Sequence, residues 1–226
     1  MGNNKVTKVI IVLVILLFPS LLYVIFTTGK HHIGQMEYYG PSTDSLVYQV
    51  PNAKFLNHLG DSISMDELDG NIILYNFFCL QCSDSSARNA LLVKAVTERF
   101  FDKKDIKYVS INLTPGDWGL AEVKEYVKPF NIEEDQWFFV TADSNYLEDF
   151  VHNGLLVNSE YDEIQKPYAP GMATIVIVDK NKHIRGFLDG NQYVDQSTII
   201  DVIKRIRLEE YQKASKKRED YFERRR

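Results

Sequence analysis

Residues 72–83 have the sequence IILYNFFCLQCS, and this stretch decides the fold. Residues 72–78 form an apolar run, which is typical of a β-strand that is buried on both faces. Cys79 and Cys82 follow directly, and they are the only cysteines of the chain. Residues 85–101 then carry apolar side chains at helical spacing. A buried strand that turns into a helix indicates an α/β domain, and the turn carries the two thiols.

Further elements surround this strand–helix unit. A hairpin at 55–63 and a helical turn at 64–69 are predicted before it. After it come predicted strands at 107–113, 137–140, 174–178 and 183–188, and helices at 120–127, 145–154 and 197–225. Alternating strands and helices predict a mostly parallel central sheet with helices on both faces, and a closing antiparallel hairpin at one edge.

The N-terminal region predicts a membrane anchor. Residues 9–29 carry no charge, and a helix of that length is about 30 Å long, which matches the hydrocarbon core of a bilayer. A cleaved signal peptide has a shorter apolar region followed by small residues, and residues 26–30 offer no such cleavage site. Lys5 and Lys8 precede the segment, so the N-terminus is expected in the cytoplasm. We therefore expect a single-pass inner-membrane protein with its C-terminal domain in the periplasm.

Charge is distributed unevenly along the chain. Residues 31–203 carry 13 Lys+Arg and 26 Asp+Glu, and residues 204–226 carry 10 basic and 5 acidic side chains. With Lys5, Lys8 and Lys30 these add up to the net charge of −5. So acidic a domain would repel a phosphate backbone, which argues against nucleic acid as a partner. The basic tail is interpreted as a solvated helix face, with contact to anionic headgroups or to an acidic partner left open. The expected organisation is a cytoplasmic end (1–8), a transmembrane helix (9–29), a linker (30–51), the domain (52–208) and a basic helical tail (209–226).

The cysteine pair carries the candidate chemistry. Two cysteines cannot staple a scaffold, but they can form a redox pair or part of a metal site. Cys82 is expected at the start of a helix, where the N–H groups and the dipole favour a thiolate, whereas Cys79 is expected to be shielded at the end of a buried strand. Three interpretations remain open: a buried apolar residue beside a remnant thiol, a redox dithiol, and a two-thiolate Cu(I) site, since soft thiolates select Cu(I).

The segment from Leu74 onward resembles the SCO/SenC family of thioredoxin-like proteins. Residues 76–83 (NFFCLQCS) are similar to the family's N-F-F-F-T-x-C-P-x-x-C-P turn. Weaker similarities follow in the family's order and spacing at residues 38–40, 60–63, 110–126, 136–143, 153–157, 178–180 and 185–186. The resemblance covers roughly residues 36–205 and implies a membrane-anchored thioredoxin-like fold.

The same resemblance implies an incomplete copper site. SCO/SenC proteins bind copper through two cysteines in a C-x-x-x-C turn and a later histidine. Here Cys82 takes the first cysteine position, Ser86 the second and Gly171 the histidine position, while the family's Asp before Pro falls on Thr114. A thioredoxin-type C-x-x-C pair would need a cysteine at Ser85. One family ligand of three therefore remains.

Two functions follow as expectations. The first is an accessory factor in respiratory oxidase assembly or copper and thiol homeostasis, with a degenerate metal site, little chemistry of its own, and an oxidase subunit or another periplasmic thiol protein as partner. The second is a periplasmic thiol–disulfide oxidoreductase that uses Cys82 with Cys79. If copper(I) binds, these same two cysteines are its candidate ligands. The five histidines are interpreted as surface or packing residues: His31, His32, His58, His152 and His183.

Overall fold

The computed structural model divides into two compact units, Met1–Gln35 and Met36–Arg226. The residues it describes are 3–28, 35–43, 46–80, 85–114, 120–132, 135–157, 174–189 and 196–225.

The first unit contains a single long helix, α1 (Asn3–Thr28). Its segment Thr7–Val24 is apolar and long enough to cross a membrane, and none of it is buried within the protein. Pro19 lies inside the helix, and the Ser20 hydroxyl donates a hydrogen bond to the carbonyl of Leu16 (3.3 Å). The predicted apolar helix is thus present, as a candidate membrane span.

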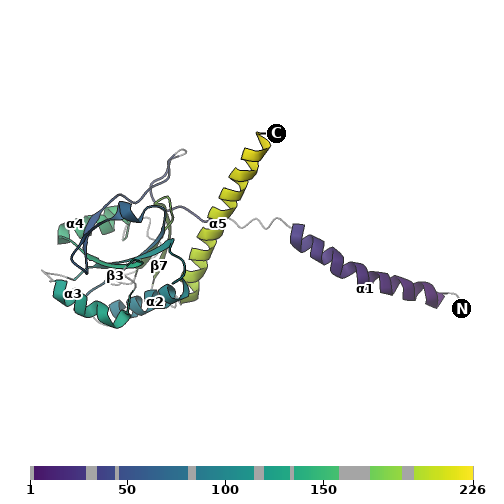
Figure 1. The fold of residues 1–226 in the computed structure, drawn as a ribbon, viewed down its shortest axis with the longest axis horizontal. Helices are drawn as coiled ribbons and strands as arrows, with labels where there is room; N and C mark the ends of the chain where they lie inside the picture. Colours follow the sequence, from purple (N-terminus) through teal and green to yellow (C-terminus); the bar gives the residue numbers. More distant parts are fainter. Residues whose placement is uncertain are drawn as a thin grey trace. The chain divides into compact units, whose positions relative to one another are not determined.

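The second unit is built on one seven-stranded sheet (Figure 1). Its strands, in the order β2-β1-β5-β4-β3-β6-β7, are β1 (Lys54–Asn57), β2 (Ser62–Ser64), β3 (Ile72–Phe78), β4 (Ile106–Asn112), β5 (Trp137–Thr141), β6 (Thr174–Val178) and β7 (Ile184–Asp189). Only β3–β4 and β4–β5 pair in parallel, and the other neighbours are antiparallel. The prediction of a mostly parallel sheet was wrong: the sheet is mixed, because a β-hairpin adds antiparallel strands to each side of the parallel core.

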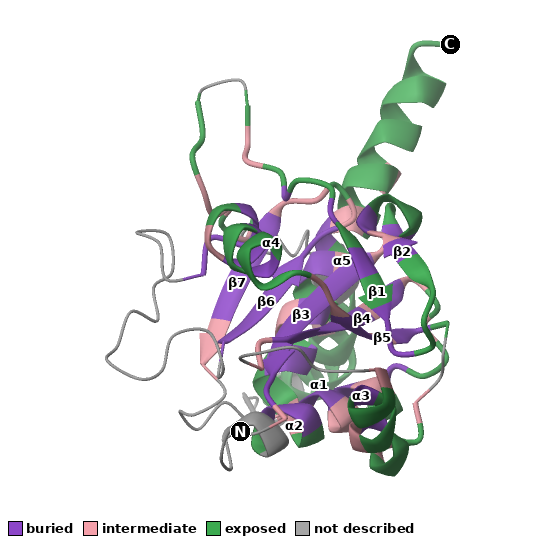
Figure 2. Cartoon of the chain, turned by 90° about the vertical axis from the view of Figure 1, so that its left-hand side faces the viewer, coloured by how far each residue is buried: buried purple, intermediate pink, exposed green. Residues whose placement is uncertain are grey.

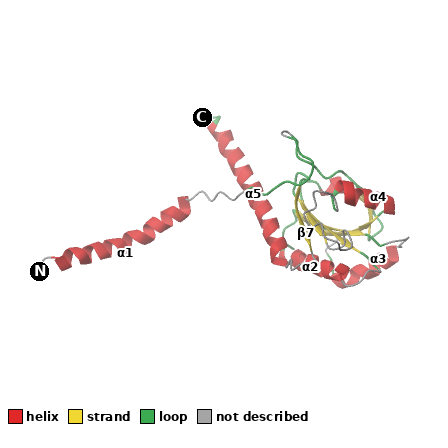
Figure 3. Cartoon of the chain, turned by 180° about the vertical axis from the view of Figure 1, so that it is seen from behind, coloured by secondary structure: helices red, strands yellow, loops and turns green. Residues whose placement is uncertain are grey.

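Helices cover both faces of this sheet, as Figure 3 shows. They are α2 (Ser85–Arg99), α3 (Leu120–Val127), α4 (Ser144–Asp149) and α5 (Gln196–Glu223), with shorter turns η1 (Met65–Leu68), η2 (Lys128–Phe130) and the π-helical η3 (Phe150–Gly154). One core cluster lies between the sheet and α2, α3 and α5. The other lies between the sheet and η1, α4 and η3.

Strand β3 lies at the centre of both clusters. All seven of its residues are buried, and Figure 2 shows them inside the fold. Tyr75 and Phe77 point to one cluster and Leu74 and Phe78 to the other, because successive side chains of a strand alternate between faces. The predicted doubly buried strand is confirmed.

Part of the predicted linker packs against the domain. The backbone N–H of Tyr39 donates to the carbonyl of Ile184 (3.1 Å), and that of Val50 donates to Lys182 (2.8 Å). The Tyr48 hydroxyl donates to the carbonyl of Gly154 (2.9 Å). Residues 36–43 and 46–51 therefore belong to the same compact unit as the sheet.

Candidate functional site

The turn after β3 places Cys79 at the end of a buried strand. Its side chain is 2% exposed and disulfide-bonded. The chain has one other cysteine, Cys82, which lies outside the described residues. The predicted shielding of Cys79 is confirmed by its burial. The predicted position of Cys82 at a helix start stays a prediction, and the described part of α2 begins at Ser85.

The backbone on both sides of Cys79 is tied to the segment that follows β4. The N–H of Leu113 donates to the carbonyl of Phe78 (2.8 Å). The N–H of Leu80 donates to the hydroxyl oxygen of Thr114 (2.8 Å). Thr114 is itself held because its N–H donates to the Asn112 side-chain carbonyl (3.0 Å). Hydrogen bonds thus hold the backbone on each side of Cys79. Thr114, at the position where the family has an aspartate, accepts one of them.

A chain of buried polar side chains lies below this turn, inside the sheet. The Ser110 hydroxyl donates to the Asn76 side-chain carbonyl (2.7 Å), and the Trp137 indole N–H donates to the Ser110 hydroxyl oxygen (2.8 Å). The three residues come from the adjacent strands β3, β4 and β5 and are buried. Burial makes such a chain specific, because a buried polar group without its partner is costly. Sequence reasoning missed it, although a polar Asn inside an apolar strand was a usable signal.

Aromatic rings close the turn from the side of α3. The Phe78 ring stacks on that of Tyr126 at 5.0 Å and meets Phe139 at 5.4 Å. Tyr126 belongs to α3 and Phe139 to β5. The residue before Cys79 is therefore fixed by packing, which limits how far the turn can move.

The family's other copper-ligand positions add no metal donors here. Ser86 lies in the first turn of α2, and Gly171 lies outside the described residues. Among the residues that the structure describes, no group of three or more His, Cys, Asp or Glu is arranged to hold a metal ion. A disulfide-bonded sulfur at Cys79 supplies no thiolate. By sequence, neither a thiolate nor an imidazole stands at two of the three family ligand positions, Ser86 and Gly171.

The described histidines are held by neighbours in the fold. His58 is buried, with its ring 6.1 Å from that of Phe139. The Nδ1 atom of His152 lies 3.1 Å from the carbonyl of Val157, and Nδ1 of His183 lies 3.4 Å from the Asp179 carboxylate. These contacts agree with the interpretation as packing residues. His31 and His32 lie outside the described residues.

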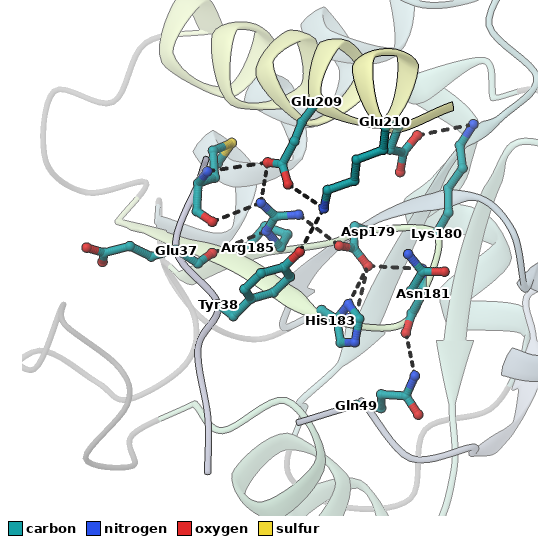
Figure 4. A network of polar contacts seen from close by, with 12 residues as sticks. Glu37, Tyr38, Gln49, Asp179, Lys180, Asn181, His183, Arg185, Glu209 and Glu210 are labelled. Carbon is teal, nitrogen blue, oxygen red and sulfur yellow. Dashed lines mark hydrogen bonds and ion pairs between the residues drawn. The ribbon is translucent and has the colours of Figure 1, made fainter. Parts of the chain in front are cut away.

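A second cluster, the Arg185 cluster, contains buried charges (Figure 4). The Arg185 guanidinium is 2% exposed and forms ion pairs with Asp179 (2.9 Å) and Glu209 (2.6 Å). Burial opposes the charge, but the hydrogen bonds to both carboxylates raise the pKa of Arg185. Burial also acts to raise the pKa of Glu209, but hydrogen bonds from Lys213 and Arg185 hold it below its ordinary value. Both directions favour the charged forms of Arg185 and Glu209.

Arg185 also holds the segment through which the chain enters the domain. Its guanidinium donates to the carbonyls of Met36 (3.0 Å) and Glu37 (3.2 Å). It lies 4.2 Å from the centre of the Tyr38 ring, a cation–π distance. The N–H of Met36 donates to the Glu209 carboxylate (3.3 Å). These contacts fix residues 36–38 against α5.

Comparisons with known proteins identify the fold. No family model and no curated protein matches the sequence. Among solved structures, a SCO1/SenC family lipoprotein from Bacillus anthracis str. Ames matches at 16% identity over 70% of this chain and 95% of its own, with a TM-score of 0.59.

Two further structures extend this likeness. BsSco, described as a member of the Sco family of cytochrome c oxidase assembly proteins with a disulfide switch, matches at 17% identity over 79% of this chain and 99% of its own (TM-score 0.59). Yeast Sco1 with copper bound matches at 15% identity over 69% of this chain and 86% of its own (TM-score 0.54). The predicted thioredoxin-like fold, of the kind found in these Sco-family structures, is confirmed.

Proposed function

We propose that this chain is a divergent, membrane-anchored member of the SCO/SenC family that assists assembly of a respiratory oxidase through protein contact. The observation that carries the proposal is the fold, which matches nearly the whole length of two Sco-family structures. The candidate span in α1 supports the anchor, and Lys5 and Lys8 before it support a periplasmic domain. The copper site is degenerate, since Ser86 and Gly171 stand at two of the three family ligand positions.

Copper affinity of the full chain in detergent tests the degenerate site. We expect the unmodified protein to bind Cu(I), measured by competition with a chromophoric chelator, at least about tenfold more weakly than the double variant Ser86→Cys/Gly171→His, because ligand number and softness set Cu(I) affinity. Ser86→Ala/Gly171→Ala is the matched control and should not strengthen binding. Tight stoichiometric binding by the unmodified protein would contradict this part of the proposal.

The second candidate function is thiol–disulfide exchange. It is favoured by one observation: Cys79 is disulfide-bonded at the end of β3, in a turn that hydrogen bonds hold on each side. In such an exchange the disulfide between Cys79 and Cys82 would take two electrons and two protons from a partner dithiol. The partner would become a disulfide, and this chain would become a dithiol.

Oxidase assembly in the native host separates the two functions. Loss of the protein should lower the amount of assembled oxidase under both proposed functions. The variant Cys79→Ser/Cys82→Ser should restore assembly if protein contact suffices, and it should fail if exchange is the function. Immunodetection of the variant at the normal level is the control, because removal of a disulfide can lower stability by about 2–5 kcal/mol.

A further inference from the structure

Residues 211–225, the C-terminal part of α5 and the two residues after it, include no buried residue. The first half is buried through Ile199, Ile203 and Ile206. From Tyr211 onward the side chains are exposed apart from the half-buried Ser215, and Figure 2 shows these turns extending from the domain. We call residues 211–225 the exposed α5 segment. Tyr211 and Phe222 are 71% and 60% exposed.

The exposed α5 segment has two different sides. Residues 218, 221, 222 and 225 follow Tyr211 at intervals that place all five on one face of a helix. They are Tyr211, Arg218, Tyr221, Phe222 and Arg225. The Arg225 guanidinium lies 4.6 Å from the Tyr221 ring centre. The acidic residues of the segment fall on the opposite side: Glu219, Asp220 and Glu223.

Charge separates this segment from the rest of the domain. It carries Lys213, Lys216, Lys217, Arg218, Arg224 and Arg225, whereas residues 31–203 have twice as many acidic as basic side chains. A face that combines arginine with tyrosine and phenylalanine suits the headgroup layer of an anionic membrane, because arginine binds phosphate in a bidentate manner and aromatic side chains collect at membrane interfaces.

The chain itself limits how far the exposed α5 segment can lie from a bilayer. Met36 and Tyr38 are held against α5. The N–H of Met36 donates to the Glu209 carboxylate, and the Lys213 ammonium donates to the Tyr38 hydroxyl (3.0 Å). These contacts are made where the exposed segment begins. Residues 29–35 join α1 to this point, and fully extended they cover at most about 28 Å. A protein anchored by α1 would therefore keep the segment close to the membrane surface.

We propose that the exposed α5 segment lies on anionic lipid headgroups, with its arginines on phosphate and its aromatic rings at the interface. This inference rests on the proposed anchoring by α1. It makes the membrane a second contact for the domain, beyond the anchor, and such contact would limit the domain's range of orientations.

Hydrogen exchange of the full chain in nanodiscs tests the proposal. We expect amides 211–225 to exchange at least about tenfold more slowly in discs with phosphatidylglycerol than in discs of phosphatidylcholine alone, since a helix end without packing opens readily and binding suppresses the opening. High salt should remove the difference, because exposed charges are screened.

Two variants of equal charge change make the test specific. The first replaces five basic residues of the segment by glutamine: Lys216, Lys217, Arg218, Arg224 and Arg225. The second does the same to five exposed lysines elsewhere: Lys54, Lys104, Lys124, Lys128 and Lys204. The first variant should lose the protection and the second should keep it.

The outcomes distinguish this inference from the anchoring on which it depends. Failure of the chain to stay in the discs after detergent removal would overturn both. Retention in the discs with equal exchange on the two lipids would overturn the headgroup contact alone. Protection that persists in the first variant, or that appears only when a disc holds several copies, would assign the segment to a protein contact instead.

Discussion

Replacing Arg185 by methionine should strongly destabilise the domain. The substitution keeps an unbranched apolar stem but removes the guanidinium that pairs with Asp179 at 2.9 Å and with Glu209 at 2.6 Å. Glu209 keeps its second ion pair, with Lys213 at 2.7 Å, so Asp179 is the carboxylate that loses most. Asp179 and Glu209 are 4% and 8% exposed. Removing one partner of a buried ion pair costs about 3–5 kcal/mol, because the remaining charge stays buried without compensation.

This loss is large compared with the stability of a typical domain. A free energy of unfolding of about 5–15 kcal/mol is usual, so the variant would lose between about a fifth of this free energy and all of it. For a domain of this size the expected fall in Tm is about 10 °C. Urea unfolding of the full chain in detergent, followed by tryptophan fluorescence, measures the difference, because Trp137 is buried in the core.

Two further variants test the physical reason. Lys128→Met removes a cation whose pair with Glu125 is exposed, so it should cost less than about 1 kcal/mol. Adding Asp179→Asn and Glu209→Gln to Arg185→Met neutralises the two carboxylates that lose the guanidinium and should recover part of the loss. A cost below about 1 kcal/mol for Arg185→Met, or no recovery in the triple variant, would refute the reasoning.

Three other predictions follow from the cysteines, the anchor and two ion-paired carboxylates. After reduction, alkylation followed by mass spectrometry should modify Cys82 quickly and Cys79, which is 2% exposed, slowly; equal fast modification would contradict the strand-end position of Cys79. A reporter that is active only outside the cytoplasm should be active when fused after residue 205, and activity of a cytoplasmic reporter there would reverse the topology. Burial acts to raise the pKa of Asp105, but hydrogen bonds from Lys180 (2.9 Å) and Arg207 hold it below its ordinary value, as the contacts described above do for Glu209. The folded state therefore binds fewer protons than the unfolded state. The stabilisation that these two carboxylates give the folded state should be present above about pH 4 and be lost as the pH falls through their folded-state pKa values. If the urea midpoint depended on pH in the same way after both residues were replaced by their amides, the prediction would be contradicted.

The central strand was predictable because its signal is local. The apolar run at residues 72–78 can be satisfied only by burial on both faces, and β3 has that burial. The order of strands and helices followed in the same way from periodicity. The mixed character of the sheet was not predictable, because it depends on which edge each hairpin joins, and strand pairing between distant segments leaves no periodic signal.

The Arg185 cluster lies beyond sequence reasoning for a related reason. Its bond to Met36 joins residues 149 positions apart, and the family similarity at residues 185–186 does not indicate that the Arg185 side chain reaches Met36. Segment 36–51 has a composition that indicates a linker, yet backbone hydrogen bonds and the Arg185 guanidinium hold parts of it on the domain. For the candidate site, sequence placed Cys79 correctly, but it missed Thr114 as an anchor of the turn and the buried Asn76–Ser110–Trp137 chain.

The bond between Tyr39 and Ile184 also bears on aggregation. Strand β7 is the last strand of the sheet, and an unprotected edge strand offers its backbone to the edge of another molecule. Tyr39 forms an antiparallel bridge to Ile184, and Arg185 beside it is occupied by Met36 and Glu37. Residues 36–39 therefore cover part of this edge and block pairing there. A fragment that starts after residue 46 would lack this cover, and two copies of it should associate through their β7 edges. A fragment that starts at Met36 should stay monomeric.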